Sequence, residues 1–62
     1  SVWNYLNDVR MERAAYYLTS LNYPVGDIDE LVGIHSRQNF YLLFKKKYGI
    51  SPSQYRKKAA GK

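Results

Sequence analysis

Cysteine is absent from this 62-residue chain, so no disulfide can staple the fold and no thiolate metal site can form. A chain this short makes one domain at most, and folding buries only about 60% of its unfolded surface. The sequence also lacks an apolar run of about 18 residues, which a membrane-spanning helix needs, and it shows no secretory leader. We therefore expect a single cytoplasmic domain without a membrane partner. Patterned sequence starts at the first residue, which indicates a piece of a larger protein.

Acidic residues are few and lie in one half of a chain whose net charge is +5. Residues 1–34 carry five acids and two arginines, whereas residues 35–62 carry eight lysines and arginines and no acid. This asymmetry favours a polyanionic partner that binds the C-terminal half. The alternative interpretation is a basic surface that only keeps the domain soluble.

Alternating strand patterns are also missing, so the predicted class is all-α, a small bundle of about four helices. Apolar spacing predicts helices at residues 1–21, 26–32 and Arg37–Tyr48. Serine caps are expected at Ser1 and Ser36, and glycine ends at Gly33 and Gly49. The expected inward faces are, in chain order, Leu6, Val9, Arg13, Ala14, Tyr17, Leu18 and Leu21; Ile28, Leu31 and Val32; and Phe40, Leu43 and Phe44.

A fourth helix is predicted over residues 51–58, because Ser51-Pro52-Ser53-Gln54 combines a serine cap, a proline in the first turn and a capping-box glutamine. Beyond about Lys57 the chain is expected to fray. The opening Ser1-Val2-Trp3-Asn4-Tyr5 echoes Ser51-Pro52-Ser53-Gln54-Tyr55. Such an echo would make sense if a related unit ended where this one begins.

Residues 26–48 form a short helix, a glycine-bearing turn and a second helix, which is the helix-turn-helix pattern. In that motif the second helix lies in the major groove of DNA. A helical wheel places Gln38, Leu42 and Lys45 on the outward arc, flanked by Tyr41 and Lys46. The expected base contacts are Arg37, Gln38, Tyr41 and Leu42, and the expected backbone contacts are Ser36, Lys45, Lys46 and Arg56.

On the same wheel Lys47 lies apart from Lys45 and Lys46, because it falls on the inward arc. Its side chain must therefore extend along the surface to bring its charge to water. Arg56 has a second interpretation, since it can also stabilise the C-terminal end of its own helix. Leu42 can equally be an isolated exposed leucine or face another protein.

Several stretches together resemble the AraC/XylS family of bacterial transcription regulators. They are Val25-Gly26-Asp27-Ile28, Val32-Gly33-Ile34, Phe40-x-x-x-Phe44-Lys45-Lys46 and Gly49-Ile50-Ser51-Pro52-Ser53-Gln54-Tyr55-Arg56. Tyr5-Leu6-x-x-x-Arg10 and Glu12-Arg13-Ala14 resemble the family's linker helix. The resemblance covers nearly the whole chain.

The resemblance implies a homeodomain-like fold in which two helix-turn-helix units, joined by one long helix, enter successive major grooves. This chain would be the second unit with its linker helix, and the first unit and a regulatory domain would lie elsewhere in the protein. Double-stranded DNA is the implied partner, RNA polymerase is a further candidate, and no cofactor is implied. The same base-contacting positions follow from the family, with Asn39 as a further candidate.

Five positions depart from the family pattern. Asp29 replaces a small alanine, which puts the packing between the two helices in doubt, and Ile34 replaces a phenylalanine while keeping an apolar plug. Gly26 replaces a serine cap, which leaves Asp27 to help the helix start. Tyr41-Leu42 stands where a small polar residue and an arginine are usual, so base recognition is expected to be weaker or directed to thymine.

Three rival functions differ in what they require. A protein-interaction module would use Tyr41 and Leu42 and would bind a partner at moderate salt. A membrane-surface helix conflicts with Asp8 and Glu12 in the first helix, since such helices need a broad apolar face. An enzyme is not expected, because the only histidine, His35, lies in a predicted turn and has no catalytic partner pair.

Overall fold

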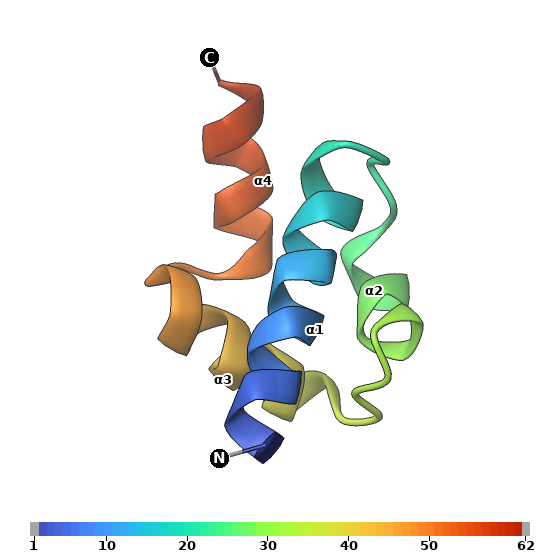
Figure 1. The fold of residues 1–62 in the computed structure, drawn as a ribbon. Coiled ribbons are helices and arrows are strands. Elements are labelled where there is room, and N and C mark those ends of the chain that lie inside the picture. Colours follow the sequence, from blue (N-terminus) through green and yellow to red (C-terminus); the bar gives the residue numbers. More distant parts are fainter. Residues whose placement is uncertain (1, 62) are drawn as a thin grey trace.

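The computed structural model describes residues 2–61, and the side chain of Trp3 is outside that description. Four helices follow one another: α1 (Val2–Thr19), α2 (Val25–Leu31), α3 (Arg37–Tyr48) and α4 (Pro52–Ala60) (Figure 1). Residues 2–61 contain no strand, so the all-α, homeodomain-like class is confirmed. The cap predicted at Ser1 and the basic end at Lys62 lie outside the described residues.

The inward face of α1 differs from the predicted one. Ala14 and Leu18 are buried as expected, but Leu6 and Leu21 are exposed, and the remaining buried positions are Asn7, Met11 and Ala15. The reason is that α1 carries apolar side chains on two opposite faces, so spacing alone cannot choose between them. The two alanines resolve the choice, because small side chains let neighbouring helices approach α1 closely.

The short helix α2 buries Ile28, and Val32 directly after the helix is also buried, both as predicted, whereas Leu31 is 50% exposed. Asp29 occupies the remaining inward position and is buried, with its carboxylate accepting the backbone N–H of Glu30 at 3.0 Å. The helices therefore accommodate this residue in place of an alanine. No side chain caps the start of α2 at Pro24, and Asp27 supplies the negative charge of its first turn.

The turn between α2 and α3 has the expected construction. Gly33 adopts a φ of 83°, a left-handed conformation that favours glycine. Ile34 is buried, and its backbone N–H donates to the carbonyl of Asp29 at 2.8 Å. The apolar plug predicted at this position is confirmed, and it fixes where α3 begins.

The ends of α3 and the start of α4 also agree with the sequence. Ser36 accepts the backbone N–H of Asn39, Gly49 closes α3 with a φ of 82°, and Ser51 and Gln54 form the predicted capping box. One boundary is different, because α4 continues to Ala60 instead of fraying near Lys57. Three consecutive residues of good helical propensity, Lys58, Ala59 and Ala60, explain the extension.

All other helices pack on α1, which runs through the middle of the fold with α2 on one side and α3 and α4 on the other (Figure 1). Phe40 and Phe44 of α3 are fully buried. The ring of Phe44 lies 4.7 Å from that of Tyr48 and 5.3 Å, edge-on, from that of Tyr55. Within residues 2–61 no helix is both long enough and apolar enough to cross a membrane.

Replacing Phe44 by alanine should destabilise the fold by about 3–5 kcal/mol, because it empties the centre of this aromatic contact. Leu42→Ala on the same helix is the matched control and should change the free energy of unfolding by no more than about 0.5 kcal/mol. Urea unfolding followed by circular dichroism measures both. Equal losses of the free energy of unfolding in the two variants would contradict this packing.

Candidate nucleic-acid interface

The outward face of α3 is open to solvent along its length. Gln38 and Lys45 are exposed, and Leu42 is 62% exposed, while Phe40 and Phe44 on the opposite face are completely buried. The helix is thus held by one side and displays the other. The wheel drawn from the sequence predicted this division.

Residues beside the outward face are partly committed to other contacts. Tyr41 is half-buried, because its ring packs at 6.0 Å, nearly edge-on, against Phe40. Ser36 uses its oxygen to accept the N–H of Asn39 at 3.3 Å, which leaves the hydroxyl proton able to donate to a phosphate. Asn39 and Lys46 are exposed.

Arg37 makes a contact that the sequence did not predict. Its Nη2 donates to the carbonyl of Gly26 at 3.3 Å, so the first residue of α3 touches the start of α2. Gly26 lies inside α2, whose N-cap position is Pro24, so it does not stand at the cap position that the sequence indicated. Because Arg37 is exposed, this single bond can be exchanged for another acceptor.

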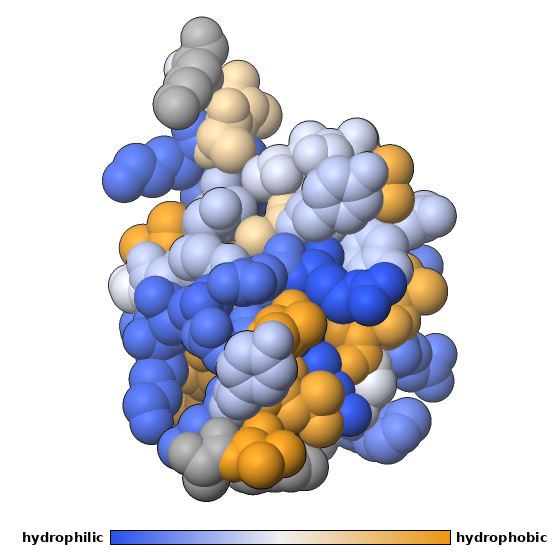
Figure 2. Space-filling model, in the orientation of Figure 1, coloured by the Kyte–Doolittle hydropathy of each residue, from blue (hydrophilic) through white to orange (hydrophobic). Residues whose placement is uncertain are grey.

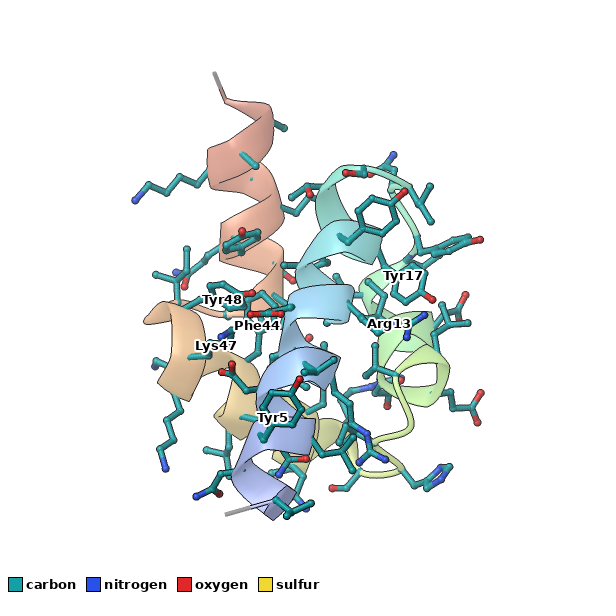
Figure 3. All side chains as sticks on the ribbon, in the orientation of Figure 1. Tyr5, Arg13, Tyr17, Phe44, Lys47 and Tyr48 are labelled. Carbon is teal, nitrogen blue, oxygen red and sulfur yellow. The ribbon has the colours of Figure 1, made fainter. Side chains whose placement is uncertain are left out.

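Lys47 differs from Lys45 and Lys46, because it forms an ion pair with α1. Its Nζ lies 2.5 Å from Asp8 and 3.7 Å from Glu12, and 5.6 Å from the centre of the Tyr48 ring. Figure 3 shows Lys47, Phe44 and Tyr48 together on the side of α1 that faces α3. The inward position was predicted, but its partners were not, although acids four residues apart on α1 are a usable signal.

The ion pair and the burial beside it shift two pKa values upward. The hydrogen bond to Asp8 is the main cause that raises the pKa of Lys47 above its ordinary value of 10.5. Burial raises the pKa of the Tyr48 hydroxyl above its ordinary value of 10.0. Both groups therefore hold their protons more tightly in the folded chain than in the unfolded one.

Arg56, one of the predicted backbone contacts, forms a hydrogen bond within the fold. Its Nε donates to the carbonyl of Leu18 at 3.1 Å, and its Nη2 is buried. Leu18 is in the last turn of α1, where backbone carbonyls lack helical partners and a positive charge is stabilising. Arg56 thus connects α4 to the end of α1.

The exposed charges are sorted by helix. Lys45 and Lys46 lie on or beside the outward face of α3, whereas the exposed carboxylates Asp27 and Glu30 lie on α2. With Lys47 neutralised by α1, the open face of α3 presents two lysines, an amide and an apolar side chain. This combination suits phosphates at the edges and base edges at the centre.

Comparison with known proteins identifies the type of domain. A family model described as a helix-turn-helix domain matches residues 1–58. The chain is 47% identical over 51 residues to the urease operon transcriptional activator of Escherichia coli. The aligned residues make up 82% of this chain and 17% of that protein. No solved structure matches it significantly.

Two further relatives have similar coverage. The bifunctional transcriptional activator/DNA repair enzyme AdaA of Bacillus subtilis is 42% identical over 52 residues, or 84% of this chain and 25% of AdaA. The DNA-binding dual transcriptional regulator Rns of Escherichia coli is 36% identical over 50 residues, or 81% of this chain and 19% of Rns. The chain therefore spans at most a quarter of these relatives.

Raising the pH should weaken the Lys47 contact. Because the folded pKa of Lys47 is raised, its stabilisation is complete below the unfolded value of 10.5 and is lost as pH rises through the folded value. Lys47→Met should thus lower the melting temperature at neutral pH and do so less above pH 10.5. Lys46→Met, which removes an exposed lysine from the same helix, is the matched control and should leave the melting temperature at neutral pH nearly unchanged. If Lys47→Met lowered the melting temperature equally at neutral pH and above pH 10.5, the ion pair of Lys47 would not be what stabilises the fold.

Proposed function

This chain belongs to the AraC-type helix-turn-helix family, and we propose that it binds double-stranded DNA sequence-specifically by placing α3 in the major groove. The role is the regulation of bacterial transcription, in the cytoplasm. The observation that carries the proposal is the open outward face of α3, held in place by the buried Phe40 and Phe44. A major groove about 12 Å wide accepts such a helix.

Within α3 the side chains divide by chemistry. Gln38 can grip adenine through paired hydrogen bonds, and Leu42 and the outer part of Tyr41 can pack on a thymine methyl group or a sugar. Arg37 joins this set when DNA replaces the Gly26 carbonyl as its acceptor. Lys45, Lys46 and Ser36 contact phosphates and set the register. Arg56 is left out of the proposed contacts because its guanidinium faces α1.

A second helix-turn-helix unit, preceding α1 in the full-length protein, is supported by an exposed apolar patch. Val2 is 85% and Tyr5 71% exposed, and Figure 2 shows apolar surface over this part of α1. Their counterparts in the sequence echo, Pro52 and Tyr55, pack against this unit, since Pro52 is buried and Tyr55 contacts Phe44. We infer that Val2 and Tyr5 cover the preceding unit in the same way.

The relatives' printed names support a regulatory context. Two of the three are transcriptional activators, so we propose that the full-length protein also carries a regulatory domain and works with RNA polymerase. The DNA repair activity in the name of AdaA is not transferred, because the chain spans only 25% of that protein. The proposed role of the present chain is binding, without a catalytic step.

A protein-interaction module remains the second candidate, because an exposed leucine on a helix face is also what such modules present. Leu42 and the outer edge of Tyr41 would be its contact residues. The two functions differ in their response to salt, since apolar docking does not release counterions. The next experiment separates them.

Replacing Lys45 and Lys46 by glutamine should reduce the salt dependence of DNA binding. Each lost phosphate contact lowers the slope of log K against log salt by about 0.9, so the double variant should lose about 1.8. Arg13→Gln is the control, because Arg13 is an exposed arginine on α1 (Figure 3) and should leave the slope unchanged. Fluorescence anisotropy with a short duplex measures it. A flat salt dependence in the wild type would favour the interaction module.

Gln38→Ala should relax sequence preference and leave the salt slope unchanged. Removing a bidentate base contact costs about 1–3 kcal/mol of discrimination at one base pair. Selection from a random duplex library, followed by competition binding, measures the loss position by position. Arg13→Gln is again the control and should leave the sequence preference unchanged. Loss of affinity for all sequences alike would show that Gln38 contacts the backbone instead.

A further inference from the structure

A hollow of about 490 Å³ lies between the first half of α1 and the second half of α3, where Figure 3 labels Lys47. We call it the α1–α3 cavity. Small-molecule sites in proteins occupy roughly 300–1,000 Å³, so this volume suits a small ligand. The lining includes Asn7, Asp8 and Met11 of α1 and Leu43, Lys46 and Lys47 of α3.

The preceding helix-turn-helix unit that we propose would leave this cavity open. That unit is expected to cover Val2 and Tyr5, which are exposed in the first turns of α1. On a helical wheel, Asn7 and Met11 lie on the other side of α1 from Val2 and Tyr5. The cavity is therefore a separate feature from the proposed contact between the two units.

Asn7 brings an unsatisfied hydrogen-bond acceptor to the cavity. The residue is only 8% exposed, and its Oδ1 is buried without a partner among residues 2–61. Leaving a buried acceptor unpaired is costly, so a donor that reached this oxygen would be bound favourably. The last torsion of an asparagine side chain is soft, and a turn of the amide can direct Oδ1 into the cavity. Asn7 thus selects a ligand with an N–H or O–H donor.

The charged side chains around the cavity select a ligand that carries both signs. Lys46 is exposed, and it takes part in neither of the two ion pairs found within residues 2–61, since both belong to Lys47. Lys46 is therefore available to an anion. Asp8 pairs with Lys47 through Oδ1, which leaves its Oδ2 to accept from a cationic donor. An acid and a lysine at one cavity match the two charges of a zwitterion.

We propose that the α1–α3 cavity binds an aliphatic α-amino acid. The ammonium group of the ligand donates to Asn7 and Asp8, its carboxylate pairs with Lys46, and its side chain packs on the apolar surface of Met11 and Leu43. A carboxylic acid without the amine leaves Asn7 unpaired, and an amine without the carboxylate leaves Lys46 unpaired. The cavity therefore discriminates against both.

Binding of the amino acid should weaken the proposed DNA contact. We assign Lys46 to a phosphate, and a carboxylate that pairs with Lys46 competes with that phosphate for the same ammonium group. By linkage, DNA and the amino acid then lower each other's affinity. This regulatory consequence rests on the proposed function, whereas the amino-acid site itself does not.

The probe is leucine, titrated into the 62-residue chain and followed by amide NMR. Shifts should cluster on residues 7–11 and 43–47 and should saturate with a Kd of about 1 mM or lower. Two analogues test the two charges: isocaproate lacks the ammonium group, and isoamylamine lacks the carboxylate. Isocaproate should bind at least about tenfold more weakly than leucine, because hydrogen bonds from charged groups are the stronger ones. Isoamylamine should bind about two- to fivefold more weakly.

Two variants test the assigned contacts. Asn7→Leu removes the buried acceptor and should weaken leucine at least about tenfold. Lys46→Gln removes an exposed cation and should weaken leucine about two- to fivefold. Lys58→Gln, which removes an exposed lysine far along the chain on α4, is the matched control and should leave the affinity unchanged. Circular dichroism checks that each variant keeps its helices, and Lys46→Gln still decides if Asn7→Leu does not fold.

Three outcomes would overturn the amino-acid site: no saturable shifts with leucine, shifts confined to other residues, or equal binding of leucine and isocaproate. A DNA titration at saturating leucine then tests the regulatory consequence. The slope of log K against log salt should fall by about 0.9, the value of one phosphate contact. Leucine that binds but leaves this slope unchanged would contradict the phosphate contact of Lys46 and leave the site standing. A chain that binds leucine but no DNA would contradict the proposed function alone.

Discussion

The burial of Phe40 and Phe44 under α1 is the contact on which the rest of the structure depends. A twelve-residue helix such as α3 is marginal on its own in water, so packing of one face must stabilise it. The two phenylalanines supply that packing, and Tyr48 and Tyr55 extend it to α4. Because the inner face is buried, the side chains of the outer face project into solvent from a helix that is held in place.

Local signals predicted the helix ends well and long-range contacts poorly. The caps at Ser36 and Ser51 and the left-handed turns at Gly33 and Gly49 involve neighbours within a few residues, so the sequence contains all the information they need. The open face of α3 was predicted for the same reason. By contrast, Arg56 bonds a carbonyl 38 residues away, and no spacing rule indicates such a partner.

The errors on α1 and α2 have a different physical origin. On α1 two apolar faces compete, and the one that carries alanines is buried because it allows closer packing. On α2 the aspartate Asp29 is buried and the leucine Leu31 is exposed, which reverses the order that hydropathy predicts.

The central position of α1 has a consequence for spacing along DNA. An 18-residue helix is about 27 Å long, which is shorter than one turn of the duplex at about 34 Å. A domain attached rigidly to its first turn would be held at a fixed distance from α3, and the length of α1 would set that distance. Insertion of half a turn of DNA duplex between the site of that domain and the site of α3 would then place one site on the opposite side of the DNA. The distance between the two DNA sites would therefore have to match the length of α1.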